Sequence, residues 1–210
     1  MTDEATDWAR FRVDRISLAT FVKRNVIHAE LLAAVLRRAR GSVLEVGVGS
    51  GAQSAILSRV VPRTVTVDND GRILSAARPN LERFGPSARL VAADAFALPF
   101  PDASLGVAVS QGLLEHFGDL AIGSLLREQL RVCRTVVFSV PSDHYPRQDV
   151  GDERLLSPVQ WQRIVEEAVA GAGYTVSARY YRFDLEALKY SAIAREYLGR
   201  FSVLVTVDPL

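Results

Sequence analysis

Residues 43–51 read VLEVGVGSG, a short apolar run that leads directly into a loop with three glycines. The apolar run predicts a buried strand, and residues 52–60 beyond the loop have the pattern of a helix that stops before Pro62. Glycines let a backbone pass close to a ligand and adopt positive φ without strain. A simple tight turn needs fewer of them than this loop contains. The stretch therefore predicts a strand, a loop and a helix that together hold a nucleotide-type ligand.

Strand-like and helix-like segments alternate along the rest of the chain. We expect strands at residues 43–46, 64–67, 89–92, 105–110, 135–140, 174–182 and 201–207, and helices at residues 8–39, 52–60, 72–84, 119–131, 157–170 and 185–198. This alternation predicts an α/β fold with a doubly wound, Rossmann-like sheet of seven strands and helices on both faces. The last two strands carry polar residues at alternate positions, so we expect them near a sheet edge, with an antiparallel C-terminal strand.

The length of 210 residues suits a single domain. Within it we expect an N-terminal helical segment over residues 1–40, a cofactor-binding core over 41–183, an inserted helix over 184–200 and a last strand over 201–210. One helix start is marked clearly, because Ser157 is a favourable N-cap residue and Pro158 follows in the first turn.

The composition argues against several classes of protein. The formal net charge is +1, from 25 basic and 24 acidic residues, so we expect no nucleic-acid partner. The single cysteine, Cys133, allows no internal disulfide and fits a reducing cytoplasm, and the three scattered histidines lead us to expect no metal site. No signal-sequence pattern is present and the apolar runs are too short to span a bilayer, so we expect no membrane partner. The oligomeric state stays open.

The glycine loop by itself leaves two ligands open. Gly47, Gly49 and Ala52 fit the dinucleotide pattern G-x-G-x-x-G/A, and Asp68 lies 19 residues after Gly49. An acid at the end of the second strand, at that spacing, is expected to bind a ribose in nicotinamide-dependent enzymes and in S-adenosylmethionine-dependent ones. The spacing therefore predicts the ribose site without choosing the cofactor.

A wider set of motifs resembles one family. Residues 43–51 resemble motif I of the class I S-adenosylmethionine-dependent methyltransferases, in which an acid precedes x-G-x-G-x-G. The later motifs of the family are matched in the same order by residues 65–68 (VTVD), 92–96 (AADAF), 98–104 (LPFPDAS) and 110–116 (SQGLLEH). The resemblance covers roughly residues 40–180 and points to the small bacterial enzymes of this family. It departs at the start of the fourth strand, where an Asp is usual and this chain has Leu105 and Gly106.

The resemblance implies roles for residues of the loop and of the strand ends that follow it: Glu45, Gly47, Gly49, Gly51, Asp68, Asn69, Asp94, Ala95 and Gln111. Glu45 would contact the methionine ammonium, directly or through water, and Asp68 would hold the ribose. Asp94 would accept from the adenine amino group. The charge of Glu45 agrees with this choice, because it favours a cationic sulfonium ligand and would repel the pyrophosphate of a dinucleotide.

Methyl transfer is an in-line displacement, so the protein mainly aligns the two reactants. A base is needed only where the nucleophile has a proton to lose. His116, after the fourth strand, and His144, after the fifth, are the catalytic candidates, with packing or surface positions as the alternatives. Tyr145 and His28 are candidates for substrate contact, the latter if the N-terminal helical segment forms a lid. The acids and the arginine of residues 151–156 are expected to fix a loop.

The acceptor is predicted to be a small molecule. No Asn/Asp-Pro-Pro-Tyr/Phe run follows the fourth strand, which disfavours methylation of amino groups in DNA, and no basic domain is added. Two other functions stay open. One is an NAD(P)-dependent reductase, although no Tyr-x-x-x-Lys dyad is evident. The other is a protein of the methyltransferase fold that binds the cofactor without transferring a methyl group.

Overall fold

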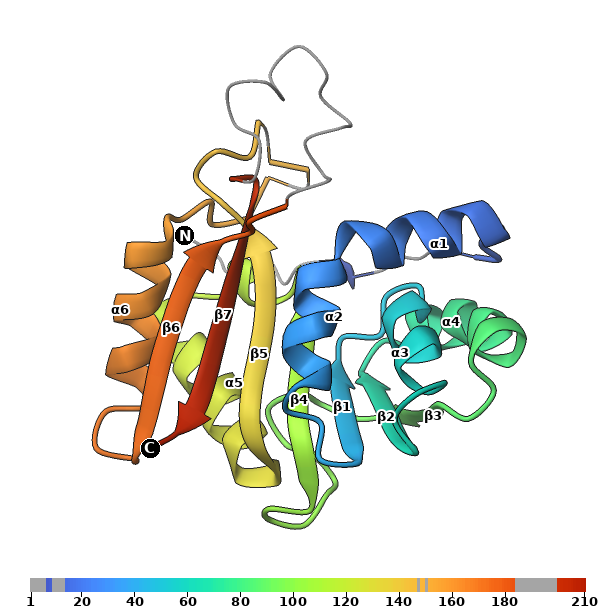
Figure 1. The fold of residues 1–210 in the computed structure, drawn as a ribbon, viewed down its shortest axis with the longest axis horizontal. Coiled ribbons are helices and arrows are strands. Elements are labelled where there is room, and N and C mark those ends of the chain that lie inside the picture. The colour runs from blue at the N-terminus through green and yellow to red at the C-terminus, as the bar shows by residue number, and fades with distance from the viewer. Residues whose placement is uncertain (1–6, 9–13, 147, 150, 184–199) are drawn as a thin grey trace.

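The computed structural model describes residues 7–8, 14–146, 148–149, 151–183 and 200–210. Seven strands form one sheet in the order β3-β2-β1-β4-β5-β7-β6 (Figure 1). The strands are β1 (Ser42–Val46), β2 (Arg63–Asp68), β3 (Arg89–Ala92), β4 (Leu105–Gln111), β5 (Cys133–Pro141), β6 (Tyr174–Tyr180) and β7 (Ser202–Pro209). The helices are α1 (Leu18–Ile27), α2 (Ala29–Leu36), α3 (Ala52–Leu57), α4 (Gly71–Phe84), α5 (Asp119–Val132) and α6 (Pro158–Ala168), with a short 3-10 turn η2 (Leu114–His116).

The direction of the strands confirms the predicted fold class. β3, β2, β1, β4 and β5 pair in parallel, whereas β7 is antiparallel to both of its neighbours. β6 forms one edge of the sheet, and its alternating half-buried and exposed side chains fit that position. The last strand of the chain lies inside the sheet, between β5 and β6, where it is almost fully buried.

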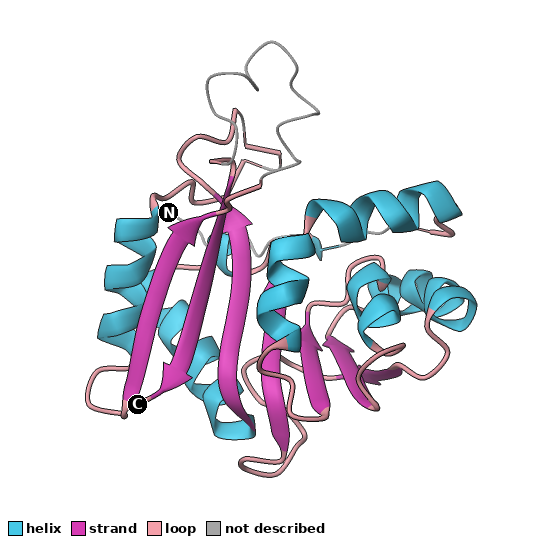
Figure 2. Cartoon of the chain, in the orientation of Figure 1, coloured by secondary structure: helices cyan, strands magenta, loops and turns pink. Residues whose placement is uncertain are grey.

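Helices cover both faces of the sheet (Figure 2). Successive residues of a strand point to opposite faces, so Val43 packs with the α2 residues Leu31 and Val35, while Leu44 packs with Ile122 of α5 and Trp161 of α6. The sheet is therefore a buried central layer between α5 and α6 on one side and α2 and α3 on the other. No helix in the described part of the chain has the length and apolar composition needed to cross a bilayer.

The N-terminal helical segment is shorter and less regular than the periodicity predicts. Residues 14 to 17 are not helical, and Ser17 is the N-cap of α1. The helix is interrupted at His28, after which α2 begins. The two helices bury their apolar faces against different partners. Phe21 of α1 stacks on Phe84 of α4 with ring centroids 4.4 Å apart, whereas α2 packs on the sheet. The helix expected at residues 185–198 lies outside the described residues, apart from which the order of elements is as predicted.

The residues that mark a helix start in the sequence, Ser157 and Pro158, do begin α6. The Ser157 side chain accepts a hydrogen bond from Gln160 N, and the Gln160 side chain accepts from Ser157 N at 2.9 Å, which makes a complete capping box at α6. At the start of β4, Gly106 lies so close to the preceding segment that a Cβ there would be 2.1 Å from the carbonyl oxygen of Ala39. The glycine that replaces part of the usual motif at this point is therefore required by close packing.

Candidate active site

A cavity of about 430 Å³ lies at the carboxyl ends of the central strands. β1 and β4 are neighbours in the sheet, and the helices that follow them, α3 and α5, cover opposite faces. Such a switch point leaves a crevice beyond the strand ends, and ligands of doubly wound folds bind there. The cavity is lined by the glycine loop, by the ends of β2, β4 and β5, and by the segment around Tyr145 to Leu155.

The glycine loop has the backbone geometry that its composition predicts. Gly47 has φ +83° and Gly49 has φ +48°, a region that other residues rarely adopt, and both line the cavity. Asn80 of α4 donates from its side chain to the Ser50 carbonyl oxygen at 3.0 Å and holds the loop from behind. Gly51 is not among the lining residues. It is the N-cap of α3, and a Cβ there would lie 3.1 Å from Leu81.

Two acids at strand ends also line the cavity. The Asp68 carboxylate, at the end of β2, accepts from Val48 N at 3.1 Å and from Asp70 N at 3.0 Å. Its partial burial raises its pKa above the ordinary value of 3.8, because desolvation outweighs these hydrogen bonds. Asp94, just after β3, accepts from Phe96 N at 2.9 Å. Asn69, Ala95 and Gln111 line the cavity with them.

Glu45 is close to the loop but faces away from the cavity lining. Glu45 is 3% exposed. Its Oε2 accepts hydrogen bonds from Ser54 N at 3.1 Å, from the Ser54 hydroxyl, and from the Thr66 hydroxyl at 3.3 Å. Desolvation by burial raises the pKa of Glu45 to about 7 in spite of these donors. The carboxylate thus joins β1, β2 and α3 beneath the loop. A contact between Glu45 and the methionine ammonium stays a prediction.

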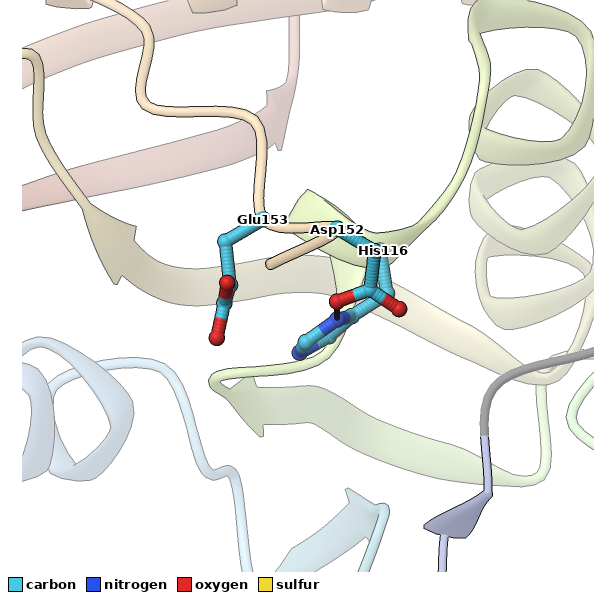
Figure 3. Close-up of side chains that lie close together, drawn as sticks. All are labelled: His116, Asp152 and Glu153. Atoms are coloured by element: carbon cyan, nitrogen blue, oxygen red, sulfur yellow. Dashed lines mark hydrogen bonds and ion pairs between the residues drawn. The ribbon is translucent and has the colours of Figure 1, made fainter. Parts of the chain in front are cut away.

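His116, in the 3-10 turn after β4, also lines the cavity. Its Nδ1 lies 2.8 Å from Oδ1 of Asp152, and its side chain is only 2% exposed (Figure 3). The Trp8 ring packs edge-on against the imidazole with centroids 5.4 Å apart, and it stacks on Phe117 at 5.9 Å. The histidine is therefore held in one orientation by a carboxylate and an aromatic ring.

Two further carboxylates lie near His116. Glu115 is 3% exposed, and its Oε1 is 3.9 Å from His116 Nε2. Burial, with smaller contributions from the charges of Glu153 and Asp152, raises the pKa of Glu115 to about 8. Glu153 is 6% exposed and its Oε2 accepts from Gly151 N at 2.9 Å. Three carboxyl groups, those of Glu115, Asp152 and Glu153, therefore lie around His116.

The remaining candidates divide by position. Tyr145 and His28 line the cavity, whereas His144 does not and instead packs beside Tyr180 with ring centroids 5.4 Å apart. The roles of these residues and of His116 stay predictions. Several lining residues carry no motif signal in the sequence, among them Trp8, Arg24, Phe117 and Asp149.

The segment of residues 151–156 does fix a loop, as expected, and it also contributes to the site. Arg154 donates from its backbone to the Glu115 carbonyl oxygen at 2.9 Å and from its side chain to the Phe117 carbonyl oxygen at 3.0 Å. These bonds hold the neighbouring Asp152 and Glu153 against the turn after β4. No signal in the sequence alone connects the two segments.

Comparison with known proteins finds similarity to methyltransferases. A family model described as a methyltransferase domain matches residues 43–135. The chain is 33% identical over 104 residues to the ribosomal RNA small subunit methyltransferase H of Trichormus variabilis, a match over 48% of this chain and 34% of that protein. It is 28% identical over 155 residues to the protein-L-isoaspartate O-methyltransferase of Shewanella halifaxensis, over 64% of this chain and 68% of that one. The chain thus spans about a third of the length of the ribosomal RNA methyltransferases that it matches.

Solved structures share the fold over nearly the whole chain. A Pyrococcus horikoshii OT3 protein aligns with a TM-score of 0.70 at 16% identity, over 98% of this chain and 100% of that chain. An Aquifex aeolicus SAM-dependent methyltransferase aligns with a TM-score of 0.61 at 15% identity, over 93% and 100%. The match of residues 43–135 to a methyltransferase domain supports S-adenosylmethionine over a dinucleotide, the choice that the glycine spacing leaves open. The methyltransferase-domain match over residues 43–135 and the shared fold support a class I S-adenosylmethionine-dependent methyltransferase.

Proposed function

We propose that this chain transfers the methyl group of S-adenosylmethionine to an O, N or C nucleophile of a small-molecule acceptor. One observation carries the proposal, namely that a single cavity is lined by Asp68 and Asp94 and also by His116 and Tyr145. In the reaction, the nucleophile's lone pair forms a bond to the methyl carbon as the carbon–sulfur bond breaks. The sulfur keeps the electron pair, and S-adenosylhomocysteine leaves.

The cofactor end is assigned from the glycine loop and the strand ends. Gly47 and Gly49 leave space beside the backbone for the methionine and the sulfonium. Asp68, with its carboxylate already oriented by two backbone N–H groups, would accept from the ribose hydroxyls. Asp94 would accept from the adenine amino group. Holding the sulfonium methyl in line with the acceptor supplies most of the rate enhancement that such an enzyme needs.

At the acceptor end, His116 is the better of the two catalytic candidates. It lines the cavity, whereas His144 does not. When His116 donates from Nδ1 to Asp152, its Nε2 carries the lone pair that receives a proton from the nucleophile. Asp152 acts here as a positioning residue. Tyr145 and His28 are proposed to contact the acceptor.

The size of the cavity favours a small acceptor. About 430 Å³ is in the lower part of the range for ligand clefts, and cofactor and acceptor share it. Aromatic rings of Trp8, Phe96 and Phe117 close around the site. The near-neutral charge gives no support for a nucleic-acid or membrane partner. We place the enzyme in the cytoplasm, since its single cysteine, Cys133, is buried and forms no disulfide.

The first experiment measures binding of S-adenosylhomocysteine by calorimetry, for the wild type and for Asp68→Ala. Loss of hydrogen bonds to a charged group should weaken binding by roughly 1.5 to 3 kcal/mol, or about 10- to 150-fold. Asp102→Ala is the control, because Asp102 is 78% exposed and lies outside the cavity lining. An unchanged dissociation constant in a folded Asp68→Ala protein would mean that the ribose lies elsewhere.

The second experiment follows transfer of a labelled methyl group to a panel of acceptors that includes small molecules, ribosomal RNA and protein. Labelled small-molecule products support the proposal. Label only in RNA or protein would overturn the small-molecule assignment. Tight S-adenosylhomocysteine binding without any labelled product would favour a cofactor-binding protein that transfers no methyl group.

A further inference from the structure

Three side chains at the acceptor end offer ligand atoms to a common point. One ligand atom each from His116, Asp152 and Glu153 lies within 4.8 Å of the other two. Figure 3 shows the imidazole of His116 and the carboxylate of Glu153 pointing to the same side of the chain, with Asp152 above the ring. We propose that the chain binds one divalent cation here, through His116, Asp152 and Glu153. The scattered histidines of the sequence predict no metal site, but this one needs only a single histidine.

The donor set suits a first-row transition metal. An imidazole nitrogen favours zinc, iron or another transition metal over calcium or magnesium, which prefer oxygen alone, and the two carboxylates also suit Mn²⁺. His116 Nδ1 lies 2.8 Å from Oδ1 of Asp152, a separation that suits two ligand atoms on one cation. Nδ1 would then be the ligand atom of His116, with the ring proton on Nε2. Mn²⁺, which accepts mixed nitrogen and oxygen ligands, is the probe that this set favours.

A second observation, on Glu115, points to a positively charged ligand. Glu115 is 3% exposed and lines the same cavity, and its Oε1 is 3.9 Å from His116 Nε2. Its Oε2 has no hydrogen-bond partner among the described residues. A buried polar atom without a partner is unfavourable, and Asp152 and Glu153 add negative charge beside the imidazole. A cation beside the imidazole would balance that charge.

The site faces the space where the acceptor is proposed to lie, since His116, Glu115 and Glu153 all line the cavity. Three protein ligands leave coordination positions for an oxygen of the acceptor. This part of the inference rests on the proposed methyl transfer and narrows the acceptor to a hydroxyl compound. The cation lowers the pKa of the hydroxyl, and its proton leaves to solvent. The oxygen lone pair then bonds to the methyl carbon as the carbon–sulfur bond breaks. In this state the imidazole holds the cation instead of accepting the proton.

The test begins with metal binding and needs no activity. The untagged full chain, stripped with a chelator, is titrated with Mn²⁺ and binding is followed by electron paramagnetic resonance. We expect one saturable site, and Asp152→Asn and Glu153→Gln should each weaken it about tenfold or more. Glu167→Gln on α6, with a side chain 70% exposed, is the matched control and should bind as the wild type does. No saturable binding at millimolar Mn²⁺, or equal binding in all variants, would overturn the site.

A measurement on the wild type protects the test against misfolded variants. Electron spin-echo spectra of the Mn²⁺ complex should show modulation from an imidazole nitrogen, and its absence would overturn ligation by His116. S-adenosylhomocysteine binding to the same samples separates the two proposals. If S-adenosylhomocysteine binds and Mn²⁺ does not, the proposed cation site is wrong and the methyl-transfer proposal stands. If Mn²⁺ binds at this site and S-adenosylhomocysteine does not bind, the cation site stands and the methyl-transfer proposal is wrong.

Discussion

Glu45→Gln should make the protein more stable at alkaline pH, because it removes a charge that the fold buries. All three hydrogen bonds that Glu45 accepts converge on Oε2, from the Ser54 backbone, the Ser54 hydroxyl and the Thr66 hydroxyl. The amide oxygen of glutamine has the same shape and can accept the same bonds. The substitution therefore isolates the charge from the packing.

The magnitude follows from the pKa of Glu45, which burial raises from 4.5 to about 7. Between these two values the folded protein holds the proton and the unfolded chain does not, so the free energy of unfolding falls as pH rises. The loss attributable to Glu45 is complete above pH 7 and amounts to roughly 3 kcal/mol. Below about pH 4 both states are protonated, and Glu45 contributes nothing to the pH dependence.

Urea unfolding of the wild type and of Glu45→Gln, measured from pH 4 to pH 8, checks this expectation. The two proteins should have similar free energies of unfolding near pH 4, and the variant should be more stable by roughly 3 kcal/mol at pH 8. Glu115 titrates in both proteins, so its contribution cancels in the difference. Parallel curves over the whole range would refute the reasoning, because they would show that Glu45 is ionised in the folded protein as easily as in the unfolded chain.

The same variant also tests the predicted contact with the cofactor. If the Glu45 carboxylate binds the methionine ammonium, Glu45→Gln should weaken S-adenosylhomocysteine binding by roughly 1.5 to 3 kcal/mol. If Glu45 only joins the strands beneath the loop, the affinity at pH 8 should stay within a few-fold of the wild type.

Two further changes test the two ends of the cavity. Gly49→Val should abolish S-adenosylhomocysteine binding in calorimetry, because φ of Gly49 is +48° and a side chain would extend into the ligand space. The control is Gly71→Ala, at a glycine with open space around it and no positive φ. Tight binding by Gly49→Val would contradict the proposed loop. His116→Ala should lower turnover about 100-fold or more while leaving cofactor affinity unchanged. The control, His144→Ala, should lose less turnover because His144 lies outside the cavity lining. Full activity of His116→Ala would return that histidine to a packing role.

Local patterns in the sequence were sufficient for most of the fold and for the place of the glycine loop and the strand-end acids beside one cavity. The apolar run before Gly47 and the alternation of segments predict strands whose carboxyl ends meet at one edge of the sheet. Asp68 and Asp94 each follow such a strand, so their place beside the glycine loop is a consequence of the topology. The capping box at Ser157 is equally local, since it lies within one helical turn.

Other features depend on contacts between segments far apart in the chain. Periodicity alone did not divide the N-terminal helical segment, because both halves are amphipathic and only their partners differ, α4 for one and the sheet for the other. The direction in which Glu45 points was also not predictable, because Ser54 and Thr66 compete with the ligand for its carboxylate.

The sequence by itself determined the class of fold, the glycine loop and the acids that follow the second and third strands, because each of these is encoded within a few residues. Only the tertiary structure decided which residues surround His116. His116 and Asp152 are 36 positions apart and meet because Arg154 ties its loop to the turn after β4. A pairing of that kind depends on where two loops pack, which no local spacing of residues records.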